Sequence, residues 1–413
     1  MNERDMDAPG TRANAPGGHA VAMDGFPPAP ASRVGPDNWY RNPWLRWGFL
    51  NRSKLVKGTP VWRGAGPVSV LPRAEGGLGA LEVEGADGAA TTLDALAAAC
   101  GLDAMLVLHR GRIVHERWLH MRPEQHHTTA SVSKSVLALV AGILAARGEL
   151  DLARTAGDYV PEMASSAMGD ATLQQLLDMQ AAIVRPPMAT RPGAIGGQDG
   201  GVYEILGLMP REPGSPSDFY EWLLAKPRHG TPGSRFYYDN GQVEALAWAI
   251  RCATGTPIAD LVSELLWAPI GAERDAWYAC DETGGEMASG GLSTTLGDLA
   301  RLGELMRAGG AAGSRQVVPE AFVADTVRGG DAEMFARSDF GARMPGASYR
   351  NFWWISHDAF GGFLAVGRYG QRIYVAPGAE LTLVHFGSME GPPPHPLDPL
   401  LGRAYRRIAQ ALS

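Results

Sequence analysis

Ser131 and Lys134 lie three residues apart in the segment Ser131-Val132-Ser133-Lys134, and their side chains could carry out hydrolysis together. Only four of the 37 basic residues are lysines, so a lysine inside an apolar segment suggests a property that arginine lacks. An amine can lose its proton, and burial lowers the pKa of a lysine by disfavouring its charged form. Residues i and i+3 share one face of a helix, which brings the hydroxyl to the amine. The spacing therefore predicts a serine nucleophile and a lysine base.

A helix must hold this pair, and residues 131–147 predict one that is apolar nearly all round and therefore buried. At the first turn, Ser131 lies near backbone N–H groups and the positive end of the helix dipole, which favour a developing anion. The pattern Ser-x-x-Lys is common by chance, so a second interpretation stays open. In that interpretation Ser131 only caps the helix, and Lys134 extends its charge to solvent.

The segment FYYDNGQ (236–242) supplies further polar groups just before another predicted helix. A tyrosine near such a lysine, here Tyr238, can relay a proton to a leaving group. The amide of Asn240 can hold the lysine or a substrate carbonyl. The alternative is an aromatic turn followed by a helix cap at Asp239 or Asn240, and for this segment taken alone the alternative is favoured.

Strands are predicted near both ends of the chain. Residues 104–120 predict a hairpin with a tight turn around Gly111, and four more strand-like runs lie within 349–387. The part between them is mostly helical with long loops, and residues 395–412 predict an amphipathic closing helix. One sheet is therefore built from distant parts of the chain, in an α/β domain that carries a helical insertion.

Three domain-level segments follow from these patterns. Residues 1–36 are rich in Gly, Pro and Ala and predict a flexible N-terminal arm. Residues 37–150 and 290–413 are assigned to the α/β domain, and residues 151–289 to the helical insertion domain. The tryptophans of segment 38–49 are interpreted as an aromatic anchor that ties the arm to the rest of the protein.

The composition, with 45% hydrophobic and 20% charged residues, is that of a globular protein. A formal net charge of −7 without a basic block argues against nucleic acid as a partner. The polar N-terminus shows no signal-peptide pattern, and the longest apolar run, 136–146, is too short to span a membrane. Three separated cysteines predict no disulfide framework. We therefore expect a cytoplasmic protein that binds no membrane, with its oligomeric state open.

Five segments resemble the serine β-lactamase-like hydrolases, a family marked by Ser-x-x-Lys, Tyr-x-Asn and Lys-Thr-Gly motifs. Within it, the chain is similar to the 6-aminohexanoate-oligomer (nylon-oligomer) hydrolases and related carboxylesterases. The segments follow the family order over residues 100–412: TTASVSKSVLALVAGIL, LQQLLDMQ, FYYDNGQVEALAWAI, SGGLSTTLGDLARLGELM and GRYGQRIYVAP. The resemblance implies a β-lactamase/penicillin-binding-protein-like fold, with an antiparallel sheet flanked by helices and an inserted all-helical domain.

The resemblance also implies roles for individual residues. Ser131 would be the nucleophile, Lys134 the general base and Tyr238 the proton relay. Asn240 falls on the third position of Tyr-x-Asn and would contact the lysine or the substrate.

The third motif departs from the family pattern, because Ala365-Val366-Gly367 stands where Lys-Thr-Gly is expected. The strand still offers the backbone N–H of Arg368, beside Gly367, as a second oxyanion donor with that of Ser131. The cation that β-lactamases use for a substrate carboxylate is missing at Ala365, with Arg368 and Arg372 as candidate replacements. This departure weakens the β-lactamase assignment and leaves an ester or amide hydrolase.

A second departure concerns a substrate-contacting tyrosine of the nylon-oligomer enzymes. Its place falls near Ala189, and Tyr203 is the nearest candidate replacement. Activity on esters is therefore expected ahead of activity on linear amides.

These observations predict a cofactor-free serine hydrolase that forms an acyl-enzyme with small carboxylic esters and, secondarily, short linear amides. No metal is expected, because His115-Glu116 and His120 are spaced i, i+5 on a predicted strand, whereas the helical zinc motif needs i, i+4. Two alternatives stay open: a β-lactamase or D-alanyl-peptide hydrolase, and a sensor protein that is acylated without turnover.

Overall fold

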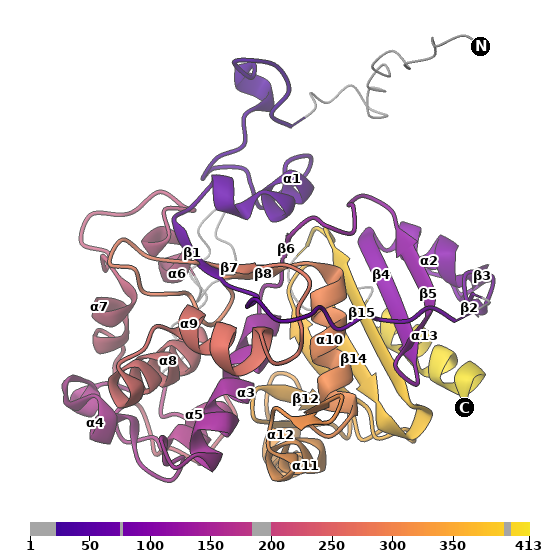
Figure 1. Ribbon diagram of the computed structural model, residues 1–413. Coiled ribbons are helices and arrows are strands. Elements are labelled where there is room, and N and C mark those ends of the chain that lie inside the picture. Colours follow the sequence, from indigo (N-terminus) through magenta and orange to yellow (C-terminus); the bar gives the residue numbers. More distant parts are fainter. Residues whose placement is uncertain (1–21, 75–76, 184–199, 392–397) are drawn as a thin grey trace.

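The main sheet of the protein has seven antiparallel strands (Figure 1). The computed structural model describes residues 22–74, 77–183, 200–391 and 398–413. Across the sheet the order is β11 (Ser348–Arg350), β12 (Trp353–Ile355), β13 (Phe363–Gly367), β14 (Gln371–Ala376), β15 (Leu381–Gly387), β4 (Leu102–His109) and β5 (Arg112–Trp118). The predicted runs within 349–387 thus pair with the predicted hairpin, so strands from both ends of the chain form one sheet, as expected.

The β4–β5 hairpin turns at Arg110 and Gly111, whose φ angles are +52° and +72°. Two consecutive positive φ values are typical of the two-residue turns that match the twist of paired strands. The tight turn predicted around Gly111 is therefore confirmed.

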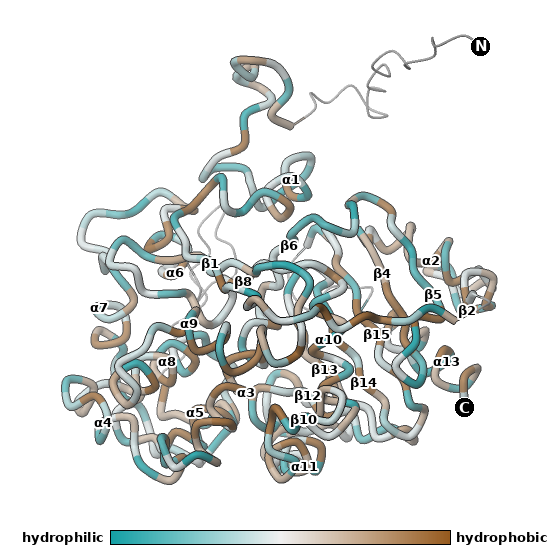
Figure 2. Tube along the Cα trace, in the orientation of Figure 1, coloured by the Kyte–Doolittle hydropathy of each residue, from teal (hydrophilic) through white to brown (hydrophobic). Residues whose placement is uncertain are grey.

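Alternate residues of the sheet face two separate layers of helices, as the period of two in a strand requires. Leu106 and Ile373 lie in one hydrophobic core, with α3 (Val132–Ala146) and α10 (Leu296–Arg307). Met105 and Tyr374 lie in the other core, with α2 (Leu93–Ala99) and α13 (Asp398–Leu412). Figure 2 shows the hydrophobic residues of β4 between these layers, in brown. The antiparallel sheet flanked by helices is the predicted fold.

A second sheet is smaller, with four strands (Figure 1). Its order is β1 (Gly58–Val61), β7 (Ala276–Ala279), β8 (Leu292–Thr294) and β6 (His127–Thr128). The mostly helical stretch 151–289 thus also contains one strand, β7. The chain is extended there because Ala276 to Ala279 pair with all four residues of β1.

The other helices and strands complete the description. The helices are α1 (Leu45–Leu50), α4 (Ala156–Tyr159), α5 (Leu173–Leu177), α6 (Gly200–Ile205), α7 (Phe219–Leu224), α8 (Asn240–Thr254), α9 (Ile258–Val262), α11 (Glu320–Arg328) and α12 (Ala332–Ala336). Short 3-10 turns include η2 (Arg52–Lys54), and the remaining strand pairs are β2 (Glu82–Glu84) with β3 (Ala90–Thr92) and β9 (Ala311–Ala312) with β10 (Arg315–Gln316). Within the described ranges, no helix is long and apolar enough to cross a membrane.

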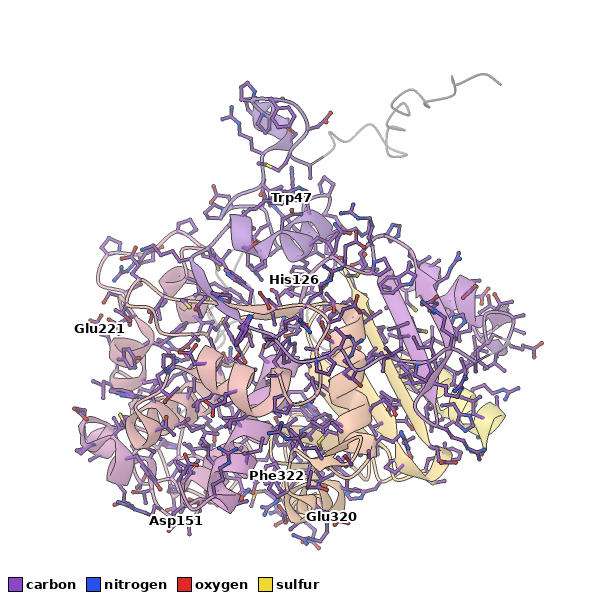
Figure 3. The ribbon with its side chains drawn as sticks, viewed as in Figure 1. Trp47, His126, Asp151, Glu221, Glu320 and Phe322 are labelled. Carbon is purple, nitrogen blue, oxygen red and sulfur yellow. The ribbon has the colours of Figure 1, made fainter. Side chains whose placement is uncertain are left out.

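Helix α3 is buried inside the molecule, as its apolar sequence predicts. Its residues from Val132 to Leu144 are buried. Gly142 leaves the space that Phe322 of α11 fills, since a Cβ at Gly142 would lie 2.6 Å from the ring of Phe322, whose position Figure 3 marks. Ser131, the residue just before the helix, is partly exposed.

The N-terminal segment before β1 is held by aromatic side chains. Trp39 is fully buried, and its indole N–H donates a hydrogen bond of 2.7 Å to the carbonyl of Leu208. Trp47, on α1, is partly buried (Figure 3). These contacts support the predicted aromatic anchor; residues 1–21 of the predicted arm lie outside the described residues.

Candidate active site

The first turn of α3 brings Ser131 and Lys134 into contact. The Nζ of Lys134 lies 2.9 Å from the Oγ of Ser131. Ser131 is partly exposed, whereas Lys134 is only 1% exposed. Ala130, just before the helix, has a φ of +47°, a left-handed conformation that costs a residue with a Cβ some free energy and is concentrated at functional sites. The geometry is that of a serine hydroxyl next to a desolvated amine.

Lys134 is held from the other side by a carbonyl group. Its Nζ donates a 2.6 Å hydrogen bond to the carbonyl of Ser289. The carboxylate of Glu244 in turn accepts hydrogen bonds from the backbone N–H groups of Ala288 (3.1 Å) and Ser289 (2.8 Å). Burial raises the pKa of Glu244, although these hydrogen bonds oppose the shift. Glu244 therefore fixes the carbonyl that positions Lys134.

Glu244 belongs to none of the motifs recognised in the sequence. The available signal was an acidic residue inside the apolar stretch VEALAWAI of α8, one helical turn after Asn240. A buried carboxylate needs hydrogen-bond donors, and the loop before β8 supplies them.

Ser133, the other serine of the motif, has a structural role. It is fully buried, and its hydroxyl donates to the carbonyl of Ala130 at 2.8 Å. Its oxygen accepts a hydrogen bond of 3.1 Å from the N–H of Leu292, and it lies 3.0 Å from the hydroxyl of Thr129. Ser133 thus joins the start of α3 to β8, and Ser131 is the serine that faces the cavity.

Tyr238 lies beside Lys134. The Nζ of Lys134 is 5.2 Å from the centroid of the Tyr238 ring. The ring is fixed by aromatic neighbours, Trp354 at 5.4 Å and Phe340 at 5.8 Å between centroids. The structure therefore brings together the three residues to which the resemblance assigns the chemistry.

Asn240 begins α8, and Asp239 caps that helix by accepting a 2.7 Å hydrogen bond from the N–H of Gly241. Lys226 forms an ion pair with Asp239, with 3.5 Å between Nζ and Oδ1. The predicted helix cap is therefore Asp239, and Asn240 lies on the wall of the cavity that contains Ser131.

That cavity gathers residues from both ends of the chain. Its walls include three residues singled out from the sequence besides Ser131, namely Asn240, Tyr203 and Arg368. The complete lining is Trp39, Phe49, Arg52, Thr128, Ala130, Ser131, Tyr203, Asn240, Met287, Ser289, Gly290, Arg368 and Tyr369. The segment before β1 was interpreted only as an anchor, but it also forms part of the wall.

Gly367 allows the end of β13 to approach the segment before Ser131. A Cβ at Gly367 would lie 2.5 Å from the carbonyl oxygen of Thr129 and 3.2 Å from the Cβ of Ala130. Only glycine fits such a close approach. Arg368, the next residue, consequently lies on the cavity wall together with Ser131.

Arg372 does not line the cavity. It is 6% exposed, and its guanidinium donates to the carbonyls of Gly367 (2.6 Å) and Gln371 (2.8 Å). The same group forms an ion pair with Asp398 at the start of α13. Arg372 is therefore occupied in holding β14 and α13, which removes one of the two candidates for a substrate-binding cation.

The site contains no metal-ligand set. In the parts of the chain that the structure describes, no three His, Cys, Asp or Glu side chains are grouped as metal ligands. His115 is buried against Asp94 of α2, with 3.1 Å between Nε2 and Oδ1.

Known proteins share this fold and these motifs. The beta-lactamase family model matches residues 89–406. A 6-aminohexanoate-dimer hydrolase from Paenarthrobacter ureafaciens is 31% identical over 373 residues, which cover 89% of this chain and 91% of that protein. A solved structure from Bacillus anthracis, provisionally named a 6-aminohexanoate-dimer hydrolase, has a TM-score of 0.85 and 33% identity, covering 92% of this chain and 97% of its own.

A family VIII carboxylesterase shares the fold alone, with a TM-score of 0.52 and 18% identity, covering 74% of this chain and 92% of its own. The resemblance and the fold inferred from the sequence are thus confirmed. The family match over most of the chain shows that this protein belongs to the beta-lactamase family and is a hydrolase.

Proposed function

We propose that the protein is a serine hydrolase that acts on small carboxylic esters through an acyl-enzyme. The observation that carries this proposal is the 2.9 Å contact between the hydroxyl of Ser131, which lines a cavity, and the buried amine of Lys134. A nucleophile within hydrogen-bond reach of a base, which is itself oriented by a third group, is the arrangement that covalent catalysis needs.

The proposed reaction begins with Lys134 as a neutral amine. It takes the proton of Ser131 while the Ser131 oxygen attacks the carbonyl carbon of the ester. The backbone N–H groups of Ser131 and Arg368 stabilise the resulting oxyanion. Collapse breaks the bond to the alkoxy group, which leaves as an alcohol with a proton passed through Tyr238. Water then attacks the acyl-enzyme and gives a proton to Lys134. The bond between the Ser131 oxygen and the acyl carbon breaks, the carboxylic acid leaves, and Lys134 returns that proton to the Ser131 oxygen.

Two features favour esters over β-lactams. Ala365, at the position of the missing lysine, is fully buried and uncharged, and Arg372 is occupied by Asp398. A short linear amide is the second candidate substrate, because Tyr203 lines the cavity and the Paenarthrobacter relative is named for hydrolysis of the 6-aminohexanoate dimer.

The test compares p-nitrophenyl butyrate, a chromogenic cephalosporin and the linear 6-aminohexanoate dimer, with Ser131→Ala as the blank. We expect the highest kcat/KM for the ester and none above background for Ser131→Ala. A kcat/KM for the cephalosporin equal to that for the ester would assign a β-lactamase instead. A lasting mass increase of one acyl group without turnover would assign an acylated sensor.

We also propose the cytoplasm as the compartment. All three cysteines are free thiols, Cys100 and Cys280 buried and Cys252 exposed. Free thiols are typical of proteins in reducing compartments.

A further inference from the structure

Arg52 lies in the wall of the cavity that contains Ser131, although it comes from the N-terminal segment, about eighty residues earlier. It begins the 3-10 turn η2 and is 8% exposed. Its guanidinium carbon lies 4.0 Å from the centroid of the Trp39 ring, a stacking contact that fixes the plane of the group. Arg52 belongs to none of the motifs recognised in the sequence.

The charge of Arg52 has no counter-ion among the described residues. No hydrogen bond or ion pair to its guanidinium is formed there, and its Nη1 is buried without a partner. The described cavity wall contains no aspartate or glutamate. Burial lowers the pKa of Arg52 to about 10, so the group stays a cation at neutral pH. A buried charge without a partner is costly, so a guanidinium left unpaired on a cavity wall is suited to an anionic ligand that would complete it.

We infer that Arg52 binds a carboxylate of the substrate, which makes the preferred substrates esters or amides that carry a second, ionised carboxyl group. A planar guanidinium donates two parallel hydrogen bonds to a carboxylate, and the stacking on Trp39 presents it in a fixed orientation. Phe49 and Tyr369, whose rings are 5.0 Å apart, provide apolar wall for the chain between the two functional groups.

This role rests on the proposed function, since it places the anion relative to a reacting group at Ser131. Arg52 would supply the substrate-binding cation that is missing at Ala365, the position of the lysine in the Lys-Thr-Gly motif. Ala365 carries no charge, and Arg372 is paired with Asp398. Arg368, whose guanidinium carbon lies 5.1 Å from the Tyr369 ring centroid, remains the competing arginine of the wall.

The experiment uses two esters with the same six-carbon acyl chain, p-nitrophenyl hexanoate and mono-p-nitrophenyl adipate. We expect the native enzyme to prefer the adipate ester, and Arg52→Met to lower the adipate-to-hexanoate ratio of kcat/KM at least tenfold, on the scale of a charge-assisted hydrogen bond. Arg41→Met removes an exposed arginine of the same segment and should leave the ratio unchanged. An unchanged ratio in Arg52→Met, or a loss of preference only in Arg368→Met, would overturn the assignment.

A binding measurement separates this inference from the proposed chemistry. Calorimetry with the catalytically blank Ser131→Ala protein should show tighter binding of monomethyl adipate, which carries one ionised carboxyl group, than of uncharged dimethyl adipate, and the added change Arg52→Met should abolish the difference. Equal affinities in Ser131→Ala would overturn the role of Arg52 even if esters are hydrolysed. Arg52→Lys keeps the charge without the planar fork, and it should retain part of the preference if Arg52→Met does not fold.

Discussion

Two buried polar regions lie close to each other in this protein and differ in how their hydrogen bonds are completed. The first, here called the Asp103 cluster, consists of Asp103, Arg46, His127 and Ser388. The carboxylate of Asp103 contacts the Nε of Arg46 at 2.6 Å and the Nε2 of His127 at 3.2 Å, and it accepts a hydrogen bond from Ser388. It joins α1, β4, β6 and the residue after β15. All of its charges are paired within the chain.

The second region is the cavity that contains Ser131, where the polar groups are held in position but not all of their atoms have a hydrogen-bond partner. Lys134 is held by the Ser289 carbonyl and directed at Ser131, while Nη1 of Arg52 is buried without a partner. A satisfied buried network stabilises the fold, whereas buried groups aimed into a cavity are arranged for a ligand. Variants in the two regions should therefore affect different measurements.

Replacement of Ser131 should have the largest effect. Ser131→Ala is expected to lower ester kcat/KM by about 10⁴-fold or more and to abolish labelling by a fluorophosphonate, because the attacking oxygen is lost. Ser133→Ala should retain the label and lose stability instead, by about 1–3 kcal/mol, because the N–H of Leu292 loses its acceptor. If the label disappeared in Ser133→Ala and survived in Ser131→Ala, the nucleophile would be Ser133 and the assignment of Ser131 would be wrong.

Lys134→Arg should come next, with a loss of about 10²–10⁴-fold in kcat, close to that of Lys134→Ala. Arginine keeps the positive charge and cannot act as the base. Lys226→Arg is the matched control, since Lys226 pairs with Asp239 and stacks on Trp222 at 4.1 Å without touching the cavity wall. A folded Lys134→Arg enzyme with near-parental activity would refute the proposed base.

Asp103→Ala should affect stability rather than chemistry. The free energy of unfolding, measured in urea, should fall by about 1–3 kcal/mol, because the buried His127 and Ser388 lose their hydrogen-bond partner, whereas the Arg46 side chain is 38% exposed and stays hydrated. Exposed Asp37→Ala should change it by less than about 0.5 kcal/mol. Unaltered stability with lost hydrolysis would instead place the Asp103 cluster in the reaction.

The smallest effect is expected at His385, a fully buried residue on the opposite side of the sheet from α3. Burial, assisted by the charge of Arg372, lowers its pKa from 6.5 to about 3. Between these pH values the unfolded chain binds the additional proton, so the stability present above pH 6.5 is lost as the pH falls toward 3, by up to about 1.4 kcal/mol per pH unit.

His385→Gln removes this proton uptake. Urea unfolding of the variant between pH 6 and 4.5 should show a pH dependence shallower by up to about 1.4 kcal/mol per unit than that of the parent. Parallel curves for the two proteins would show that His385 does not titrate on unfolding.

The sequence alone determined the features that depend on local spacing. The i, i+3 relation of Ser131 and Lys134 places both groups on one helical turn, whatever surrounds the helix. The apolar run after them predicted burial, and the two strand-like runs around Gly111 predicted a hairpin with a tight turn. These are properties of neighbouring residues, and they were sufficient for the α/β layout with a helical insertion and for the proposed nucleophile and base. The specific fold was implied by the resemblance of five segments to a known family.

Tertiary structure decided what completes the site. Glu244 reaches Lys134 only through the carbonyl of Ser289, and Arg52 enters the cavity because Trp39 fixes the N-terminal segment. The sequence position of Arg372 made it a candidate for the substrate-binding cation. In the structure, its guanidinium is instead paired with Asp398 of the closing helix. Each of these outcomes depends on which distant segments pack together, and the periodicity of a single segment contains no information about its partner across the cavity.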